Sequence, residues 1–188
     1  MKKYNLVTDT ISKNELFKLS KWIRSAKKLT MGNLCIKFEK KFSSFIKRKY
    51  SIFVNSGSSA NLLMAKSLLE ANYLRNKIII APALSWSTTI MPFEQLGYDI
   101  KLCDCDPDNL GLDIKHLEKL CKKYKPSTII LVHVLGHANN MKKILQICKK
   151  YKIFLLEDTC EALGSKFKNI NLGNFSLMSS YSFYYGHH

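Results

Sequence analysis

A regular alternation of short apolar runs with amphipathic segments, beginning near residue 50, most constrains how this chain can fold. The apolar runs are 51–54, 77–81, 99–103, 128–132 and 153–156. The segments between them have helix-type spacing of apolar residues and cover 59–71, 88–96, 114–124 and 140–151. Strands separated by helices predict an α/β fold, a mainly parallel sheet flanked by helices on both faces.

The alternation covers only the middle of the chain. Residues 13–26 and 33–46 predict two amphipathic helices ahead of it. We therefore expect an N-terminal helical arm, residues 1–48, and an α/β region, residues 49–188. Within the α/β region the alternation ends after Gly164, where the next segments predict a hairpin and a further strand. That hairpin covers 166–174, and that strand covers 178–183.

The formal charge of +16 raises the question of a nucleic-acid or membrane-surface partner. The lysines form short scattered pairs such as Lys122-Lys123, and no basic stripe is interleaved with aromatic residues. We therefore favour a solvated lysine-rich surface and expect neither nucleic acid nor membrane as partner. An anionic small substrate would also suit this charge.

Cysteine spacing and the N-terminal composition indicate a cytoplasmic protein. Residues 1–15 are polar, without the apolar core of a signal peptide, and no apolar run approaches the ~20 residues needed to span a bilayer. The six cysteines lack metal-site spacing, so no metal site is expected. Reduced buried thiols are the preferred interpretation, with a disulfide framework as the alternative.

Polar stretches follow the predicted strands, and ligands of parallel α/β sheets bind beyond the carboxyl ends of strands. Asn55-Ser56-Gly57-Ser58-Ser59-Ala60 opens a helix, where glycine and free amides could hold a phosphate. An ordinary serine-capped helix start is the alternative. Neither the Walker A pattern nor G-x-G-x-x-G occurs, which argues against a nucleoside triphosphatase or a conventional dinucleotide site.

Four further candidate site residues follow along the chain, at or beyond the ends of predicted strands. Trp86 could lie flat against a planar ring, or could pack in the core. Asp158 could bond a protonated ring nitrogen, or could cap a following helix. Ser182 offers another phosphate donor, and His187 offers a base that titrates near neutrality. A phosphate cradle, an aromatic plate, a carboxylate and a reactive residue, in this order, indicate a pyridoxal-phosphate site.

Taken together, these motifs resemble the DegT/DnrJ/StrS-type sugar aminotransferase family, whose members are fold-type I pyridoxal-phosphate enzymes. The resemblance spans about residues 29–188 and includes Asp104-Cys105-Asp106-Pro107 and Val132-His133-Val134-Leu135-Gly136. It also includes Glu157–Ala162 and Ser182–His187.

The resemblance implies a role for each matching site residue. Gly57 and Ser58 would hold the cofactor phosphate, and Ser182 would add a hydroxyl to it. Trp86 would stack on the pyridine ring, and Asp158 would pair with the ring nitrogen. A sixth residue, Glu161, stands where the aminotransferases usually carry glutamine, near the ring hydroxyl of the cofactor.

His187 departs from the family pattern, because most members carry a Schiff-base lysine in this slot. A histidine there resembles the deoxysugar 3-dehydratase branch, and Phe-Tyr-Tyr-Gly-His-His resembles its GDP-4-keto-6-deoxymannose type. The resemblance implies 3-dehydration of a nucleotide-linked 4-keto-6-deoxyhexose in deoxysugar or O-antigen biosynthesis. Pyridoxal or pyridoxamine 5'-phosphate would be the cofactor, His187 the base, and glutamate or a similar amine the amino donor.

Several alternatives stay open beside this interpretation. The chain could be a sugar aminotransferase of the same family or a 3-dehydratase of a CDP-linked sugar. It could also be an inactive, truncated cofactor-binding remnant, and His187-His188 could begin a purification tag. Because family members continue well past this length, we expect the N-terminal portion of a longer enzyme. The rest of the large domain and a small C-terminal domain would be absent, and the full-length form would be a homodimer.

Overall fold

The computed structural model describes residues 11–187 and divides them into two compact units. One unit holds the described residues up to Phe53 together with Tyr184–Gly186, and the other holds Val54–Phe183 together with His187. Residues 1–10 and 188 lie outside the described residues. The expected absence of a signal peptide falls mainly on these residues and therefore stays a prediction.

The first unit contains the two expected helices, α1 (Lys13–Ser25) and α2 (Asn33–Phe45). A capping box begins α1, because Ser12 Oγ accepts from the Glu15 backbone N–H and the Glu15 carboxylate accepts from the Ser12 backbone N–H. These reciprocal bonds satisfy donors that the first helical turn leaves free.

The prediction of a strand at 51–54 is wrong. No strand in the described part of the chain pairs with this segment. Its polar groups bond instead to Glu39 of α2. Ser51 Oγ donates to the Glu39 carbonyl, and the Phe53 backbone N–H donates to Glu39 Oε1 at 2.8 Å. A strand needs a partner ladder for its backbone groups, and here a side chain takes that place.

The second unit is built on a five-stranded sheet whose strand order is β2-β1-β3-β4-β7. All four strand pairs are parallel. The strands are β1 (Ile78–Pro82), β2 (Asp99–Cys103), β3 (Thr128–Val132), β4 (Phe154–Asp158) and β7 (Met178–Ser180). The expected hairpin is present as β5 (Lys166–Phe167) and β6 (Ile170–Asn171). The last strand ends at Ser180, sooner than the predicted 178–183.

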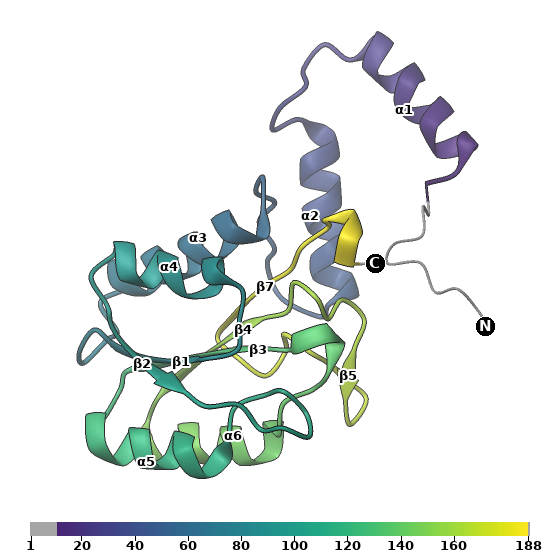
Figure 1. Ribbon diagram of the computed structural model, residues 1–188. Helices are drawn as coiled ribbons and strands as arrows, with labels where there is room; N and C mark the ends of the chain where they lie inside the picture. Colours follow the sequence, from purple (N-terminus) through teal and green to yellow (C-terminus); the bar gives the residue numbers. More distant parts are fainter. Residues whose placement is uncertain (1–10, 188) are drawn as a thin grey trace, which may run out of the picture. The chain divides into compact units, whose positions relative to one another are not determined.

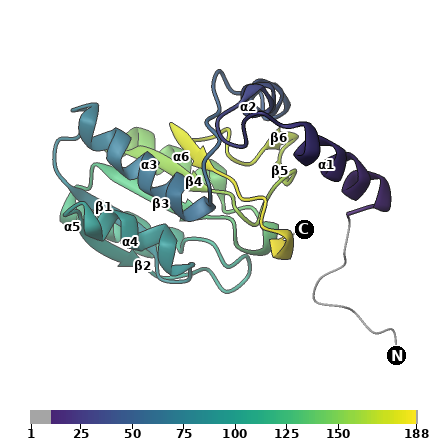
Figure 2. The same cartoon turned by 90° about the horizontal axis from the view of Figure 1, so that it is seen from above.

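Helices cover both faces of this sheet, which confirms the predicted α/β architecture. Figures 1 and 2 show α3 (Gly57–Glu70) and α4 (Ser87–Gln95) on one face. The other face carries α5 (Ile114–Tyr124) and α6 (Met141–Tyr151). Successive strand residues divide between two cores: in β1, Ile79 packs on the α3 side and Ile80 on the α5 side. Two short 3-10 helices are η1 (Val134–Gly136) and η2 (Tyr185–His187).

Three further features bear on the expected compartment and ligands. In residues 11–187, no helix is long and apolar enough to cross a membrane. The same part of the chain has no group of three or more His, Cys, Asp or Glu residues that could hold a metal ion. All six cysteines are free thiols.

Candidate functional site

The beginning of α3 lies against the segments that follow β4 and β7. A Cβ atom on Gly57 would be only 2.7 Å from Cys160 Sγ and 3.5 Å from Ser182 Cβ. Glycine is therefore what permits this close approach. Ser56 caps the helix by accepting from the Ser59 backbone N–H at 3.1 Å. The predicted cradle residues Gly57 and Ser182, far apart in sequence, are thus neighbours at a helix N-terminus.

Ser58 joins the cradle to the next helix. Its side chain is exposed, and its hydroxyl donates to Thr88 Oγ1 at 2.9 Å, in the first turn of α4. The N-termini of α3 and α4 therefore meet through two hydroxyl groups. Free backbone amides and hydroxyls at a helix start attract a phosphate.

Asp158, the last residue of β4, is 4% exposed and accepts hydrogen bonds from three residues. Asn61 Nδ2 donates to its Oδ2 at 2.9 Å, and Thr89 Oγ1 donates to the same oxygen at 2.8 Å. The Cys160 backbone N–H donates to Oδ1 at 3.1 Å. The alternative role of Asp158 as a helix cap is wrong, because β5 and not a helix follows β4.

Trp86 occupies the N-cap position of α4, and its side chain is 72% exposed. The alternative of a packed core aromatic is therefore wrong. The Trp86 carbonyl accepts from the Thr89 backbone N–H at 3.0 Å, and Thr89 in turn bonds Asp158. Trp86 is thus one helical turn before the residue that bonds the carboxylate, and its exposed indole can contact a ligand.

Glu161 and His187 have different surroundings from the residues above. Glu161 Oε2 accepts from the Leu135 backbone N–H at 2.8 Å. Leu135 has a φ of 50°, in the left-handed region, and Gly136 follows with a φ of 79°. The Glu161 carboxylate therefore holds the loop after β3. His187 is exposed in η2, at the fifth position after Ser182.

Two residues that bond Asp158 escaped the sequence-based prediction. Asn61 is 1% exposed and lies on the buried face of α3 with Met64, Ala65 and Leu68. A polar residue at a helical position where the spacing predicts an apolar one was the available signal. Thr89, fully buried, gave no comparable signal, because threonine is common at a helix start.

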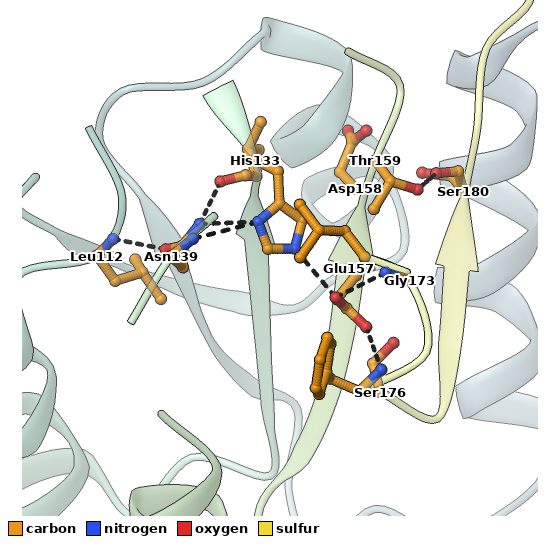
Figure 3. Close-up of polar contacts among 12 residues, drawn as sticks. Leu112, His133, Asn139, Glu157, Asp158, Thr159, Gly173, Ser176 and Ser180 are labelled. Carbon is orange, nitrogen blue, oxygen red and sulfur yellow. Dashed lines mark hydrogen bonds and ion pairs between the residues drawn. The ribbon is translucent and has the colours of Figure 1, made fainter. Parts of the chain in front are cut away.

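A second buried polar network lies on the opposite face of the sheet, beside Asp158 in sequence (Figure 3). His133 Nε2 and Glu157 Oε2 are 3.0 Å apart, and both side chains are fully buried. The Asn139 backbone N–H donates to His133 Nδ1 at 3.4 Å, so Nδ1 is the acceptor and the proton resides on Nε2. His133 therefore donates to the Glu157 carboxylate.

Glu157 anchors the segment that leads into β7. Its carboxylate accepts from the backbone N–H groups of Gly173 and Phe175, both at 2.9 Å. Burial alone would raise the pKa of Glu157, but hydrogen bonds from His133, the Gly173 backbone and Ser176 outweigh it. The pKa of this carboxyl is consequently below its ordinary value of 4.5.

Comparison with known proteins agrees with this architecture. The model of the DegT/DnrJ/EryC1/StrS aminotransferase family matches residues 10–188. The chain belongs to that family, as its motifs predicted.

Both a curated relative and two solved structures are 3-dehydratases. The chain is 34% identical to a GDP-4-keto-6-deoxy-D-mannose 3-dehydratase of Yersinia pseudotuberculosis, over 98% of this chain and 47% of the relative. A structure of the E. coli enzyme with bound hydrated PLP matches at a TM-score of 0.88 and 35% identity. That match covers 95% of this chain and 46% of the other.

A second structure, with a trapped PLP-glutamate geminal diamine, matches at a TM-score of 0.90 and 35% identity. It covers 97% of this chain and 48% of the other. These matches confirm the predicted fold. The chain spans about half the length of the curated relatives it matches.

Proposed function

We propose that this chain forms the cofactor-binding part of a pyridoxal- or pyridoxamine-phosphate-dependent nucleotide-sugar enzyme. The reaction proposed is 3-dehydration of a nucleotide-linked 4-keto-6-deoxyhexose in deoxysugar or O-antigen biosynthesis. The observation that carries the proposal is that the buried Asp158 carboxylate and the Gly57–Ser182 cradle share a neighbour, Cys160. The Cys160 backbone N–H donates to Asp158, and its sulfur lies against Gly57. The names of the relatives support the dehydratase class over other reactions of the family.

The residues at this edge of the sheet fit a planar, cationic ring with a phosphate arm. The N-terminus of the 14-residue helix α3 presents backbone amides. The Ser182 hydroxyl would be an additional donor, as would the Ser58 hydroxyl if it turned from Thr88 toward the phosphate. Asp158 can accept from a protonated ring nitrogen, and the exposed indole of Trp86 can cover one face of the ring. Glu161 is proposed to lie near the ring hydroxyl. When bound, the cofactor supplies an electron sink.

His187 would act as the base that takes a proton from the carbon next to the cofactor ring. Imidazole titrates near neutrality, which suits a general base in the cytoplasm. It cannot make the covalent link that a lysine makes, so the noncovalent contacts above must retain the cofactor. These contacts would hold the cofactor in its amine form, for which an amino donor would supply the nitrogen. The PLP-glutamate adduct in a relative supports glutamate as that donor.

The test separates binding from chemistry in the enzyme that carries this chain. His187→Asn is expected to abolish release of the sugar 3-hydroxyl while pyridoxamine phosphate binds with unchanged affinity. Asp158→Asn is expected to weaken that binding, measured by absorbance titration. Full dehydratase activity in the His187→Asn enzyme would refute the base assignment. A wild-type protein that binds no pyridoxamine phosphate would favour the remnant.

We also propose the remaining features of the whole protein. Residues 1–48 would form the arm of a homodimer, whose partner subunit covers apolar side chains of α1 such as Phe17, 69% exposed, and Ile23, 52% exposed. The full-length enzyme would reside in the cytoplasm. Light scattering should give twice the chain mass, and Phe17→Ser should shift the equilibrium toward the monomer. A monomeric wild-type enzyme would refute the dimer.

A further inference from the structure

The side-chain amide of Asn61 bridges the Asp158 carboxylate and an unsatisfied helix carbonyl. Its Nδ2 donates to Asp158 Oδ2 at 2.9 Å and to the Thr88 carbonyl at 3.2 Å. In an α-helix that carbonyl would accept from the backbone N–H four residues later. The residue there in α4 is Pro92, which has no N–H. One amide nitrogen of α3 thus serves both the carboxylate and the carbonyl that Pro92 leaves free.

The Asn61 amide is held in one orientation. Its Oδ1 is buried and has no hydrogen-bond partner among the described residues. Turning the amide over would set this oxygen against two acceptors, Asp158 Oδ2 and the Thr88 carbonyl. The chain therefore keeps a buried, unpartnered oxygen in order to direct the nitrogen toward Asp158.

The two side-chain donors bond the same oxygen of the Asp158 carboxylate. Asn61 from α3 and Thr89 from α4 both donate to Oδ2, whereas Oδ1 accepts from the Cys160 backbone N–H and, among the described residues, from neither helix. Each carboxylate oxygen has two lone pairs, so the two helix donors fill Oδ2, and Oδ1 is the oxygen that a further donor can approach. The side chains of Asn61 and Thr89 thereby determine how the carboxylate is rotated.

We propose that Asn61 is a positioning residue, which with Thr89 locks the Asp158 carboxylate so that Oδ1 is left to receive the protonated ring nitrogen of the cofactor. The inference rests on the proposed function, because Asp158 is the ring-nitrogen partner there. It adds that the strength of this contact is set from α3, the helix whose N-terminus forms the phosphate cradle. Phosphate binding and ring binding would thus both depend on one short helical segment: Gly57 lies in the cradle, and Asn61 orients the carboxylate that bonds the ring.

The test replaces Asn61 by leucine, which has the same number and branching of side-chain heavy atoms and suits the apolar neighbours on that face of α3. Pyridoxamine phosphate is titrated into wild-type, Asn61→Leu and Asp158→Asn proteins while the ring absorbance is recorded across pH. We expect Asn61→Leu to weaken binding about tenfold. We also expect it to lower by about one unit the pH at which the bound ring loses its proton. Asp158→Asn should weaken binding about a hundredfold. The inhibition constant of inorganic phosphate should equal the wild-type value in both variants, because the cradle is unchanged.

Two further variants separate positioning from folding. Thr128→Val removes another buried, unpartnered oxygen, on β3, and should leave binding and its pH dependence unchanged. If Asn61→Leu alone folds poorly, the measurement is made in a Pro92→Ala background, where the Thr88 carbonyl regains a backbone donor. Only the bond to Asp158 is then lost.

The outcomes distinguish failure of the Asn61 positioning role from failure of the proposed cofactor-binding function. If Asp158→Asn loses the ring-proton signal and Asn61→Leu keeps the wild-type affinity and pH profile, only the inference is overturned. Equal loss of inorganic phosphate and pyridoxamine phosphate by Asn61→Leu would indicate a merely structural role and would also overturn it. If the wild-type protein binds no pyridoxamine phosphate at any pH, the proposed function and the inference both fall.

Discussion

The close approach of α3 to the turn after β4 makes Gly57→Ala a sharp test of the cradle geometry. The added Cβ would lie 2.7 Å from Cys160 Sγ, whereas nonbonded carbon atoms prefer ~3.5–4.0 Å. Its next neighbour, Ser182 Cβ, is 3.5 Å away, an ordinary contact. The clash therefore comes from one atom, and removing that atom should relieve it.

The expected magnitudes follow from this single contact. Overpacking of this kind destabilises a protein by about 1–3 kcal/mol, so we expect Gly57→Ala to lower the free energy of unfolding by about 2 kcal/mol. In a Cys160→Ala background the same change should be neutral, or should stabilise by about 0.5 kcal/mol because alanine restricts the unfolded chain. The coupling energy between the two substitutions should therefore be about 2 kcal/mol.

Urea unfolding of the wild-type, two single-variant and double-variant proteins measures this coupling. The dependence of the free energy of unfolding on urea concentration must agree among the four proteins, so that the midpoints report stability and not altered compactness. Gly97→Ala is the matched control for a glycine without close neighbours, although its φ of 73° adds backbone strain. That variant should lose stability equally with and without Cys160→Ala. Additive effects of Gly57→Ala and Cys160→Ala, within about 0.5 kcal/mol, would refute the close approach.

Two further predictions concern stability. Glu157→Gln should destabilise the protein by about 3 kcal/mol at pH 7, because His133 and two backbone N–H groups lose a buried carboxylate. The folded-state pKa of Glu157 is lowered, so its stabilisation is complete above pH 4.5 and is lost as pH falls through that lower pKa. Urea midpoints of wild-type and variant should thus converge in acid, and a constant difference would contradict the pairing. Arg75→Ala should cost about 2 kcal/mol, since its guanidinium donates to the Lys125, Pro126, Tyr151 and Lys152 carbonyls at the ends of α5 and α6. Arg75→Lys should recover little, because an ammonium cannot reproduce the fork, and wild-type stability in that variant would contradict this role.

Much of the fold was predictable because its signals are local. Apolar runs of strand length indicate burial on both faces, and β1, β3 and β4 confirm this. The run at 51–54 has the same composition, but no strand in the described part of the chain pairs with it. Composition reports that a segment can be a strand, and only its neighbours decide whether it becomes one.

The candidate site divides in the same way. Position at the end of a strand pointed to Asp158, because strand ends in a parallel sheet meet at one edge. Gly57 was placed after a strand that the described residues do not contain, and only its place at the start of a helix, α3, is confirmed. The sequence alone could not predict that Asn61 bonds Asp158, since these residues are 97 positions apart and their pairing depends on how α3 packs on β4. It also could not predict that Glu161 bonds the Leu135 backbone N–H, which depends on the loop after β3.

The sequence by itself determined the α/β architecture, the family and the residue types at the strand ends. These follow from periodicity, local turn chemistry and motif order, all of which lie within short windows of the chain. Only the tertiary structure decided which oxygen of Asp158 is filled, because the two donors come from helices on separate segments. Hydrogen-bond direction depends on the relative placement of distant backbones, and no short window of residues contains that information.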